Sequence, residues 1–252
     1  MYDREYEGLY GIRRLRSIIT PIYLKYFRDS ANLLELNCGT GTDAIALARQ
    51  GLCVLATDLS PSMIHEAQKK VTSRQLQEKV QTRVMEFNHI SVLHDMRFDG
   101  AYSNMGGINC TSDLSLIASN LASLIRKDGY FIATVMPNFC LWETAAFLFR
   151  FRWKQAFRRR NKNACDAHLH GGTVRTFYHS PRDFAGAFSL HFEVVELMGL
   201  NIFTPPPNSP GAYRLFPTLM GLLEHVDNRI SHTYPFTSIG DHYLIVLRRK
   251  TS

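Results

Sequence analysis

The sequence lacks most of the features that mark secreted, membrane-spanning or metal-stabilised proteins. No stretch approaches the roughly 18 uncharged apolar residues that indicate a transmembrane helix, and the charged start has no apolar segment typical of a signal peptide. Internal repeats and low-complexity tracts are also missing. The 5 cysteines include no Cys-x-x-Cys pair, and their odd number argues against a disulfide framework or a zinc site. We therefore expect a cytoplasmic protein with free thiols, no bound metal and no membrane-spanning helix.

Acidic residues are missing from one short segment, and this segment carries the basic excess of the chain. The formal net charge is +7, from 29 Lys and Arg against 22 Asp and Glu. Residues 150–162 hold seven of these bases and no acid, so the remaining bases and acids balance. A basic protein often binds nucleic acid or a membrane surface. In this chain, such binding would involve the one basic segment and not the whole surface.

Short apolar runs alternate with helical segments along most of the chain. The runs that we expect to be strands are 33–36, 53–57, 80–87, 100–103, 130–136, 192–197 and 242–247. The segments that we expect to be helices include 10–27, 43–50, 114–125 and 181–188, with a further helix opening at Ser60-Pro61. This alternation predicts an α/β fold built from βαβ units on a parallel sheet. The alternation breaks at residues 139–180, where the chain is aromatic and basic.

The first expected strand ends in a turn with two glycines, Glu35-Leu36-Asn37-Cys38-Gly39-Thr40-Gly41-Thr42. Glycines let a backbone adopt left-handed geometry and approach a ligand closely. Asp58 ends the second strand about 20 residues later, where an acid can bind the hydroxyls of a ribose. It can equally cap the turn before Ser60-Pro61. The turn does not match the nicotinamide fingerprint Gly-x-Gly-x-x-Gly, because residue 44 is Ala.

These segments and others in order resemble the motifs of class I S-adenosylmethionine-dependent methyltransferases. The turn resembles motif I, with Asn37 in place of the usual first glycine, and residues 58–63 resemble motif II. Residues 98–104 resemble motif IV, residues 124–131 resemble the turn before the fifth strand, and residues 80–87 have the spacing of the strand whose terminal acid binds adenine. The resemblance covers roughly residues 30–137 and resumes at 177–200.

The resemblance implies a Rossmann-like, seven-stranded, mostly parallel sheet with helices on both faces. It further implies S-adenosyl-L-methionine as cofactor and S-adenosyl-L-homocysteine as product. We expect one methyltransferase domain over residues 1–252, with a cofactor-binding core at 30–137. Residues 138–180 and 201–240 are expected to form lid insertions over the substrate.

The resemblance assigns a cofactor-binding role to ten residues. The implied roles are placement of the methionine end, binding of the ribose hydroxyls, packing against adenine, reading of the adenine edge, and contact beside the sulfonium. Glu35 places the methionine end, and Asn37, Gly39 and Gly41 form the turn that passes close to the cofactor. The other roles belong, in that order, to Asp58; to Leu59 and Met63; to Glu86 and the Phe87 backbone; and to Asn104. Met63 can equally be a core residue, and Glu86 an ordinary strand end.

The segment after the fourth expected strand bears on the methyl acceptor. It reads Asn104-Met105-Gly106-Gly107 and lacks the Asn/Asp-Pro-Pro-Tyr motif of enzymes that methylate DNA amines or protein glutamine. The chain resembles instead the ubiquinone-biosynthesis-like branch, which methylates small molecules. We therefore predict methyl transfer to a small molecule, anionic or lipophilic, without nucleic acid as a partner. A non-catalytic S-adenosylmethionine-binding regulatory or scaffold protein is the alternative. No feature indicates an oligomeric state.

The lid and the last strand contain the candidates for a general base. These candidates are His168, His170, Tyr178, His179, Glu143 and His242. We select His170 and Tyr178 as catalytic, although any of these histidines can be purely structural. The basic segment 150–162 has three interpretations: a solvated helix face, a cleft for an anionic acceptor, or part of a membrane contact through residues 139–162. The last follows from large apolar residues beside Arg and Lys, the composition of an interfacial helix.

Overall fold

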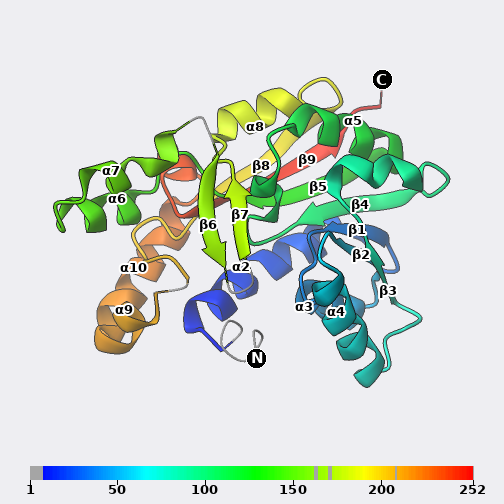
Figure 1. Cartoon of the computed structure of the whole chain (residues 1–252), viewed down its shortest axis with the longest axis horizontal. Helices are drawn as coiled ribbons and strands as arrows, with labels where there is room; N and C mark the ends of the chain where they lie inside the picture. Colours follow the sequence, from blue (N-terminus) through cyan, green and yellow to red (C-terminus); the bar gives the residue numbers. More distant parts are fainter. Residues whose placement is uncertain (1–7, 162–163, 170–171, 208, 252) are drawn as a thin grey trace.

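The central feature of the computed structural model is one seven-stranded sheet in the order β3-β2-β1-β4-β5-β9-β8 (Figure 1). The structure describes residues 8–161, 164–169, 172–207 and 209–251. Both neighbours of β9 pair with it antiparallel, and the other neighbouring strands of this sheet pair parallel. The strands are β1 Asn32–Leu36, β2 Cys53–Asp58, β3 Val80–Val84, β4 Phe98–Ser103, β5 Ile125–Val135, β8 Phe192–Leu200 and β9 His242–Arg249. The predicted Rossmann-like, mostly parallel architecture is confirmed.

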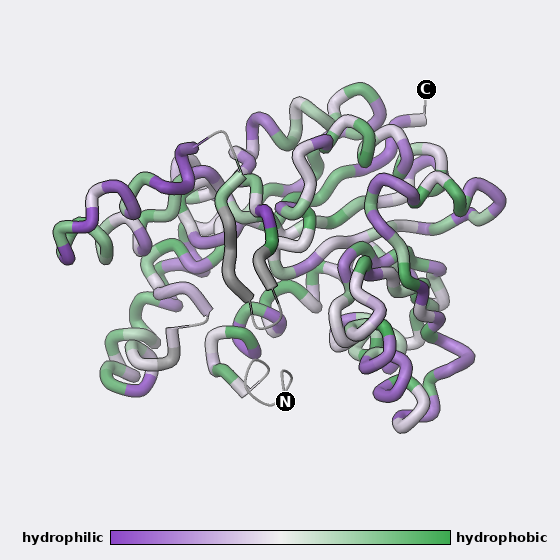
Figure 2. The backbone as a smooth tube through the Cα atoms, in the orientation of Figure 1, coloured by the Kyte–Doolittle hydropathy of each residue, from purple (hydrophilic) through white to green (hydrophobic). Residues whose placement is uncertain are grey.

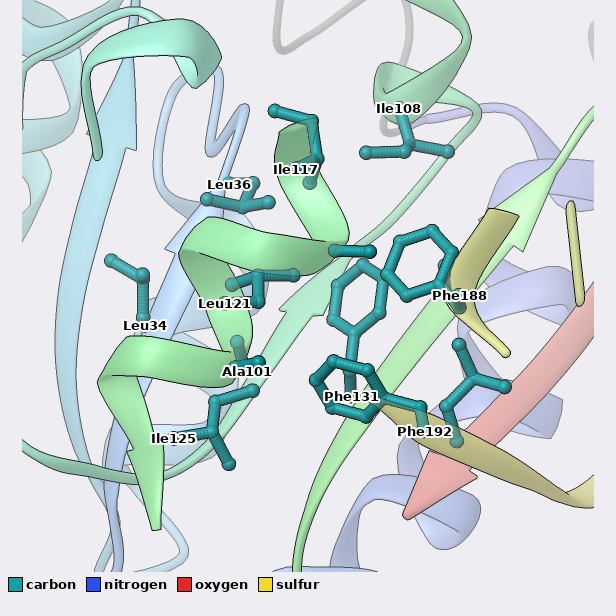
Figure 3. Close-up of a cluster of buried hydrophobic side chains, with 14 of the residues drawn as sticks. Leu34, Leu36, Ala101, Ile108, Ile117, Leu121, Ile125, Phe131, Phe188 and Phe192 are labelled. Carbon is teal, nitrogen blue, oxygen red and sulfur yellow. The ribbon is translucent and has the colours of Figure 1, made fainter. Parts of the chain in front are cut away.

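Helices cover both faces of the sheet, because successive strand residues point to opposite sides. Leu33 joins a buried cluster with the helices α2 Tyr10–Tyr26, α3 Thr42–Ala48 and α4 Pro61–Ser73. Leu34 joins a second cluster, with α5 Leu114–Leu124, α8 Pro181–Phe188 and the 3₁₀ helix η1 Phe87–Leu93. In this second cluster Phe131 of β5 stacks on Phe188 at a ring-centroid distance of 5.4 Å (Figure 3).

Local sequence signals set the helix starts. The Ser60 hydroxyl accepts the Met63 N–H at 3.4 Å with Pro61 at the first helical position, and Ser180 with Pro181 opens α8 in the same way. A side-chain acceptor before the first turn satisfies an N–H that has no partner within the helix, and proline has no N–H to leave unpaired. The expected starts of both helices are therefore confirmed.

Several strand boundaries differ from the prediction, among them the end of β3 and the start of β5. β3 ends at Val84 and not at Phe87, because the chain turns after the Met85 N–H bonds the Asp58 carbonyl at 2.9 Å and then enters η1. β5 begins at Ile125, five residues before the expected start at residue 130. The residues expected to form a tight turn are instead an irregularity in the strand, where Asp128 is left-handed with φ +60°.

Two groups of shorter elements project from the sheet. The first contains α6 Leu141–Leu148, α7 Trp153–Ala156, the 3₁₀ helix η3 Arg158–Arg160 and a two-stranded antiparallel sheet of β6 Cys165–Leu169 and β7 Gly172–Thr176. The second contains α9 Pro210–Leu215, α10 Pro217–Ile230 and the 3₁₀ helix η4 Phe236–Ser238, while η2 Gly107–Cys110 follows β4. Helices α6, α7, α9 and α10 lie at the same end of the molecule (Figure 1). None of the helices in the described ranges is both long and apolar enough to cross a bilayer.

The basic segment is not one helix. It runs from the end of α6 through the four-residue α7 into η3. The interpretation as a solvated helix face fails for Arg159, whose side chain is only 8 % exposed and contacts two carboxylates.

Candidate active site

The turn after β1 leaves open space at the carboxyl edge of the sheet. Asn37, Gly39 and Gly41 all have left-handed backbones, with φ of +55°, +53° and +74°. A Cβ atom added at Gly39 would have no atom within 4 Å, whereas one at Gly41 would lie 3.0 Å from the Ala67 Cβ. Gly41 is therefore needed for packing against α4, and the backbone at Gly39 is accessible to a ligand.

Asp58 closes the other side of this space. Its two carboxylate oxygens accept the Gly39 N–H at 2.8 Å and the Ser60 N–H at 2.9 Å. The capping role considered from the sequence is thus present. An ionised carboxylate can accept about four hydrogen bonds, so Asp58 keeps capacity for ribose hydroxyls. The side chain of Leu59, next to it, is 66 % exposed, as a residue that packs on a bound adenine would be.

Glu35 lies beneath the turn and is only 2 % exposed. Burial raises the pKa of its carboxyl well above the ordinary value, and the negative charge of Asp43 raises it further. Its Oε2 atom is buried without a regular hydrogen bond in the described part of the chain, although the Tyr102 hydroxyl acts on the carboxyl and opposes the rise in its pKa. An unpaired buried acceptor is costly unless something satisfies it. Glu35 therefore has one acceptor available to a ligand that reaches beneath the turn.

Asn37 and Asn104 join the turn after β1 to the turn after β4. The Asn37 amide donates to the Asn104 carbonyl at 3.1 Å and accepts the Ser103 hydroxyl at 2.6 Å. A Cβ at Gly107 would lie 1.8 Å from the Asn37 Nδ2, so this glycine makes room for Asn37. The Asn104 amide donates to Asp43 at 2.9 Å, and its oxygen accepts both the Met105 N–H and the Thr134 hydroxyl. Both side chains hold the site together, and a direct contact with the cofactor remains a prediction for them.

The residues expected at the adenine edge lie beyond the end of β3. Glu86 is two residues past Val84, so the expectation that it ends the strand is wrong. Its carboxylate accepts the Asn88 amide at 3.0 Å and lies 3.6 Å from His89 Nδ1. Phe87 is half-buried against the core, and Met63 is half-buried at the start of α4. Adenine binding by these three residues stays a prediction.

An aspartate–histidine pair lies at the same edge of the sheet. Because β9 runs antiparallel and Tyr243 pairs with Val135, His242 is placed at the carboxyl end of β5. His242 Nδ1 is 2.9 Å from Asp241 Oδ2. Its Nε2 is 3.3 Å from the position of a Cβ at Gly106, in the left-handed turn after β4. The imidazole therefore faces the segment that resembles motif IV.

Arg159 fixes Asp241 and links it to α6. The Arg159 Nη2 atom lies 2.6 Å from Asp241 Oδ1 and 2.7 Å from Glu143 Oε2, and its Nη1 donates to the Asp241 carbonyl at 3.0 Å. Burial acts to raise the pKa of the Asp241 carboxyl, but the contacts with His242 and Arg159 outweigh it and hold that pKa well below the usual range. Cys140, Glu143 and Asp241 have metal-ligand atoms within 4.8 Å of one another. The guanidinium of Arg159 already pairs with both carboxylates, so this cluster is a salt bridge and not a candidate metal site.

The two residues selected as catalytic are only partly described. His170 lies outside the described residues. The Tyr178 ring packs over the Arg159 guanidinium at 5.2 Å, and burial raises the pKa of its phenol. Burial lowers the pKa of His179, whose Nε2 lies 3.2 Å from the Thr111 carbonyl oxygen. His242 was among the candidates, but its position after Asp241 at the start of the last strand favoured a structural role when only the sequence was considered.

The comparison with protein families adds a decisive observation to this geometry. Residues 33–129, which contain the turn, Asp58, Glu86 and Asn104, match the family model described as a methyltransferase domain. Residues 33–129 are similar to a methyltransferase domain. The resemblance noted in the sequence is thereby confirmed.

Relatives of known sequence match this methyltransferase domain over part of their length. A ubiquinone biosynthesis O-methyltransferase from Coxiella burnetii is 30 % identical over 128 residues, which cover 48 % of this chain and 53 % of that protein. The chain thus matches about half the length of these curated relatives.

Solved structures support the same fold across nearly the whole chain. A putative S-adenosylmethionine-dependent methyltransferase from Listeria monocytogenes has a TM-score of 0.64 at 16 % identity and covers 96 % of this chain and 99 % of its own. A geranyl diphosphate C-methyltransferase from Streptomyces coelicolor, solved with S-adenosyl-L-homocysteine, has a TM-score of 0.59 at 14 % identity, over 94 % of this chain and 82 % of its own. At these identities the likeness concerns the fold.

The resemblance to methyltransferases implies S-adenosylmethionine as the cofactor, and the residues present fit it. The space at Gly39 is open, Asp58 keeps hydrogen-bonding capacity, and Glu35 Oε2 has no regular hydrogen bond among the described residues. These three features lie on one turn and on the strand ends beside it.

Proposed function

We propose that this protein transfers a methyl group from S-adenosylmethionine to a small lipophilic molecule and that His242 is the general base. The single observation that carries the proposal is the Asp241–His242 pair at the carboxyl edge of the sheet, with Nε2 beside Gly106. The match to an O-methyltransferase supports an acceptor that must lose a proton.

His242 would take the proton that the acceptor loses. S-adenosylmethionine, when bound, would supply an electrophilic methyl group for an acceptor oxygen and would leave as the neutral thioether S-adenosylhomocysteine. The acceptor proton passes to His242 Nε2. Asp241 Oδ2 lies 2.9 Å from His242 Nδ1, close enough for its charge to orient the ring, although Nδ1 makes no hydrogen bond among the described residues. A base positioned in this way contributes about 10²–10⁴-fold to the rate.

Tyr178 and His170 remain proposals as catalytic residues. Because burial raises the pKa of the Tyr178 phenol, this side chain is protonated near neutral pH. It is therefore better suited to donate a hydrogen bond than to remove a proton, and we assign the base to His242 in preference.

An apolar pocket favours a lipophilic acceptor over an anionic one. It has a volume of about 320 Å³ and is lined by Leu141, Trp142, Ala145, Ile202, Phe203 and Leu223. It adjoins the pair, because the Leu141 N–H bonds the Ile239 carbonyl and the Asp241 N–H bonds the Asn201 carbonyl. Arg158 and Arg159 both pair with Glu143, so their charge is partly compensated.

Two measurements test the proposal. Calorimetry should show that the folded protein binds S-adenosylhomocysteine with micromolar-range affinity, and the absence of binding would refute the cofactor site. A panel of lipophilic phenols is then incubated with S-adenosylmethionine, and S-adenosylhomocysteine formation is measured. Turnover in the wild type that is lost in His242→Gln, with unchanged S-adenosylhomocysteine binding, supports the base. Binding without turnover on any phenol favours the regulatory or scaffold alternative.

A further inference from the structure

The connection between α6 and α7 exposes large aromatic side chains at one end of the molecule. Phe149 is 87 % exposed, Phe151 82 % and Trp153 61 %. We call residues 141–156 the α6–α7 hairpin. It projects beyond the sheet (Figure 1), and strongly apolar residues alternate with strongly hydrophilic ones along it (Figure 2). Contiguous exposed aromatics of this kind mark interaction sites.

The backbone holds Phe151 outward at an energetic cost. Its φ is +56°, in the left-handed region that a bulky side chain rarely adopts. The turn is nonetheless well formed, with the Phe151 N–H bonded to the Leu148 carbonyl and the Arg152 N–H bonded to the Phe147 carbonyl, both at 2.9 Å. Glycine would satisfy the same geometry without strain. Nothing in the packing of the described residues requires a phenylalanine here, so its use points to a role outside the fold.

Positive charge surrounds these aromatics. Arg150, Arg152, Lys154 and Arg160 are exposed and have no carboxylate partner among the described residues. Glu143 is the only acidic residue between residues 139 and 161, and its carboxylate forms salt bridges with Arg158 and Arg159. The surface thus combines apolar bulk with uncompensated positive charge.

The aromatics also line a hollow. A pocket of about 440 Å³ lies between the end of α6 and α7, and its lining is entirely apolar: Ala145, Leu148, Phe149, Phe151 and Trp153. Ala145 also lines the apolar pocket beside Asp241. On the same end of the molecule, α9 and α10 expose further apolar side chains (Figure 1), namely Leu215, Phe216, Leu219 and Leu222.

We propose that the α6–α7 hairpin docks this protein on an anionic phospholipid surface. The aromatic tip enters the interface, and Arg150, Arg152 and Lys154 contact the headgroup phosphates. Aromatic and aliphatic residues beside Lys and Arg are the composition that binds such surfaces. Docking of a second copy on the same patch would bring the bases of both copies together, which opposes association. The docking is independent of methyl transfer.

Sedimentation with vesicles tests the docking. The full chain is mixed with vesicles of phosphatidylcholine containing one third phosphatidylglycerol, and with pure phosphatidylcholine vesicles. We expect pelleting with the anionic vesicles at low salt, reduced by high salt, and little with the neutral ones. No pelleting with anionic vesicles would overturn the proposal, as would tighter binding to RNA or DNA of random sequence.

Two variants separate the docking from folding. Phe151→Gly relieves the left-handed strain, so thermal stability should be unchanged or higher while vesicle affinity falls about tenfold, as expected for losing one buried aromatic. Arg150→Ala and Arg152→Ala should each weaken binding to anionic vesicles about fivefold. Unchanged affinity in all three variants would overturn the proposal, as would a wild-type dimer that Phe151→Gly dissociates.

A third measurement distinguishes this inference from the proposed function. Trp142 and Trp153 are the 2 tryptophans, so Trp142→Phe leaves Trp153 as a single reporter. Its emission should shift to shorter wavelength on adding anionic vesicles, and an unshifted spectrum would count against insertion of the tip. S-adenosylhomocysteine binding should be equal in Phe151→Gly, Arg150→Ala, Arg152→Ala and the wild type. If the protein pellets with the vesicles but does not bind S-adenosylhomocysteine, the docking proposal stands and the proposed function is wrong.

Discussion

Replacing Arg159 by methionine should strongly destabilise the fold, because it would leave two buried carboxylates with less compensation. Arg159 is 8 % exposed, Asp241 6 % and Glu143 12 %, with contacts of 2.6 and 2.7 Å. Removing one partner of a buried ion pair costs about 3–5 kcal/mol. Urea unfolding followed by circular dichroism at pH 7 measures this loss.

Arg158 provides the matched control. It pairs with the same Glu143 at 2.5 Å but is 48 % exposed, and exposed pairs contribute about 0–1 kcal/mol. Arg158→Met should therefore have little effect. The reasoning would be refuted if both variants lost the same free energy of unfolding.

The pH dependence of the loss follows from the same contacts. The wild-type Asp241 has a lowered pKa, so its stabilising effect is present above the unfolded pKa and is lost only as the pH falls through the lower folded pKa. Without Arg159 that pKa rises, and Asp241 can become protonated at mildly acidic pH. The deficit of Arg159→Met relative to the wild type should therefore shrink between pH 7 and pH 5, and a deficit that grew instead would contradict this account.

Three further predictions concern the site. Asp58→Ala should weaken S-adenosylhomocysteine binding at least tenfold in calorimetry, with Asp95→Ala, an exposed acid outside the site, as control. His242→Gln should lower kcat by about 10²–10⁴-fold and leave that binding unchanged, and Asp241→Asn should lower kcat less. The pKa of the Glu35 carboxyl is raised in the folded protein. As the pH rises above the pKa of this group in the unfolded chain, the free energy of unfolding should therefore fall by about 1.4 kcal/mol per pH unit. Glu35→Gln should remove this dependence of the free energy of unfolding on pH. If the free energy of unfolding changed equally between pH 5 and pH 7 in the wild type and the variant, the prediction would be wrong.

The sequence predicted the sheet and the cofactor turn because their signals are local. Ser-Pro pairs opened α4 and α8 at the expected residues, and the two glycines of the turn after β1 have the expected left-handed backbones. The apolar run that includes Leu33 and Leu34 identified a strand buried on both faces. Each of these patterns is read within about ten residues of the chain.

The contacts of Arg159 with Asp241 and Glu143 were not predicted, because the first of them joins residues 82 positions apart in the sequence. Arg159 sits in an acid-free segment and looks solvated when only its neighbours along the chain are considered. Its partners come from α6 and from the start of β9. In the same way, β3 appeared longer in the sequence because Met85 and Phe87 are apolar, although they pack against the core from outside the strand.

The position of β9 has a consequence for how the sheet is assembled during synthesis. β8 has β9 as its only neighbour in the sheet, and β9 separates it from β5. Until residues 242–249 have been made, β8 cannot join the sheet and the carboxyl edge lacks His242. The turn after β1, Asp58 and the β4 turn are all complete much earlier. The residues of the cofactor turn are therefore synthesised long before His242, the proposed base.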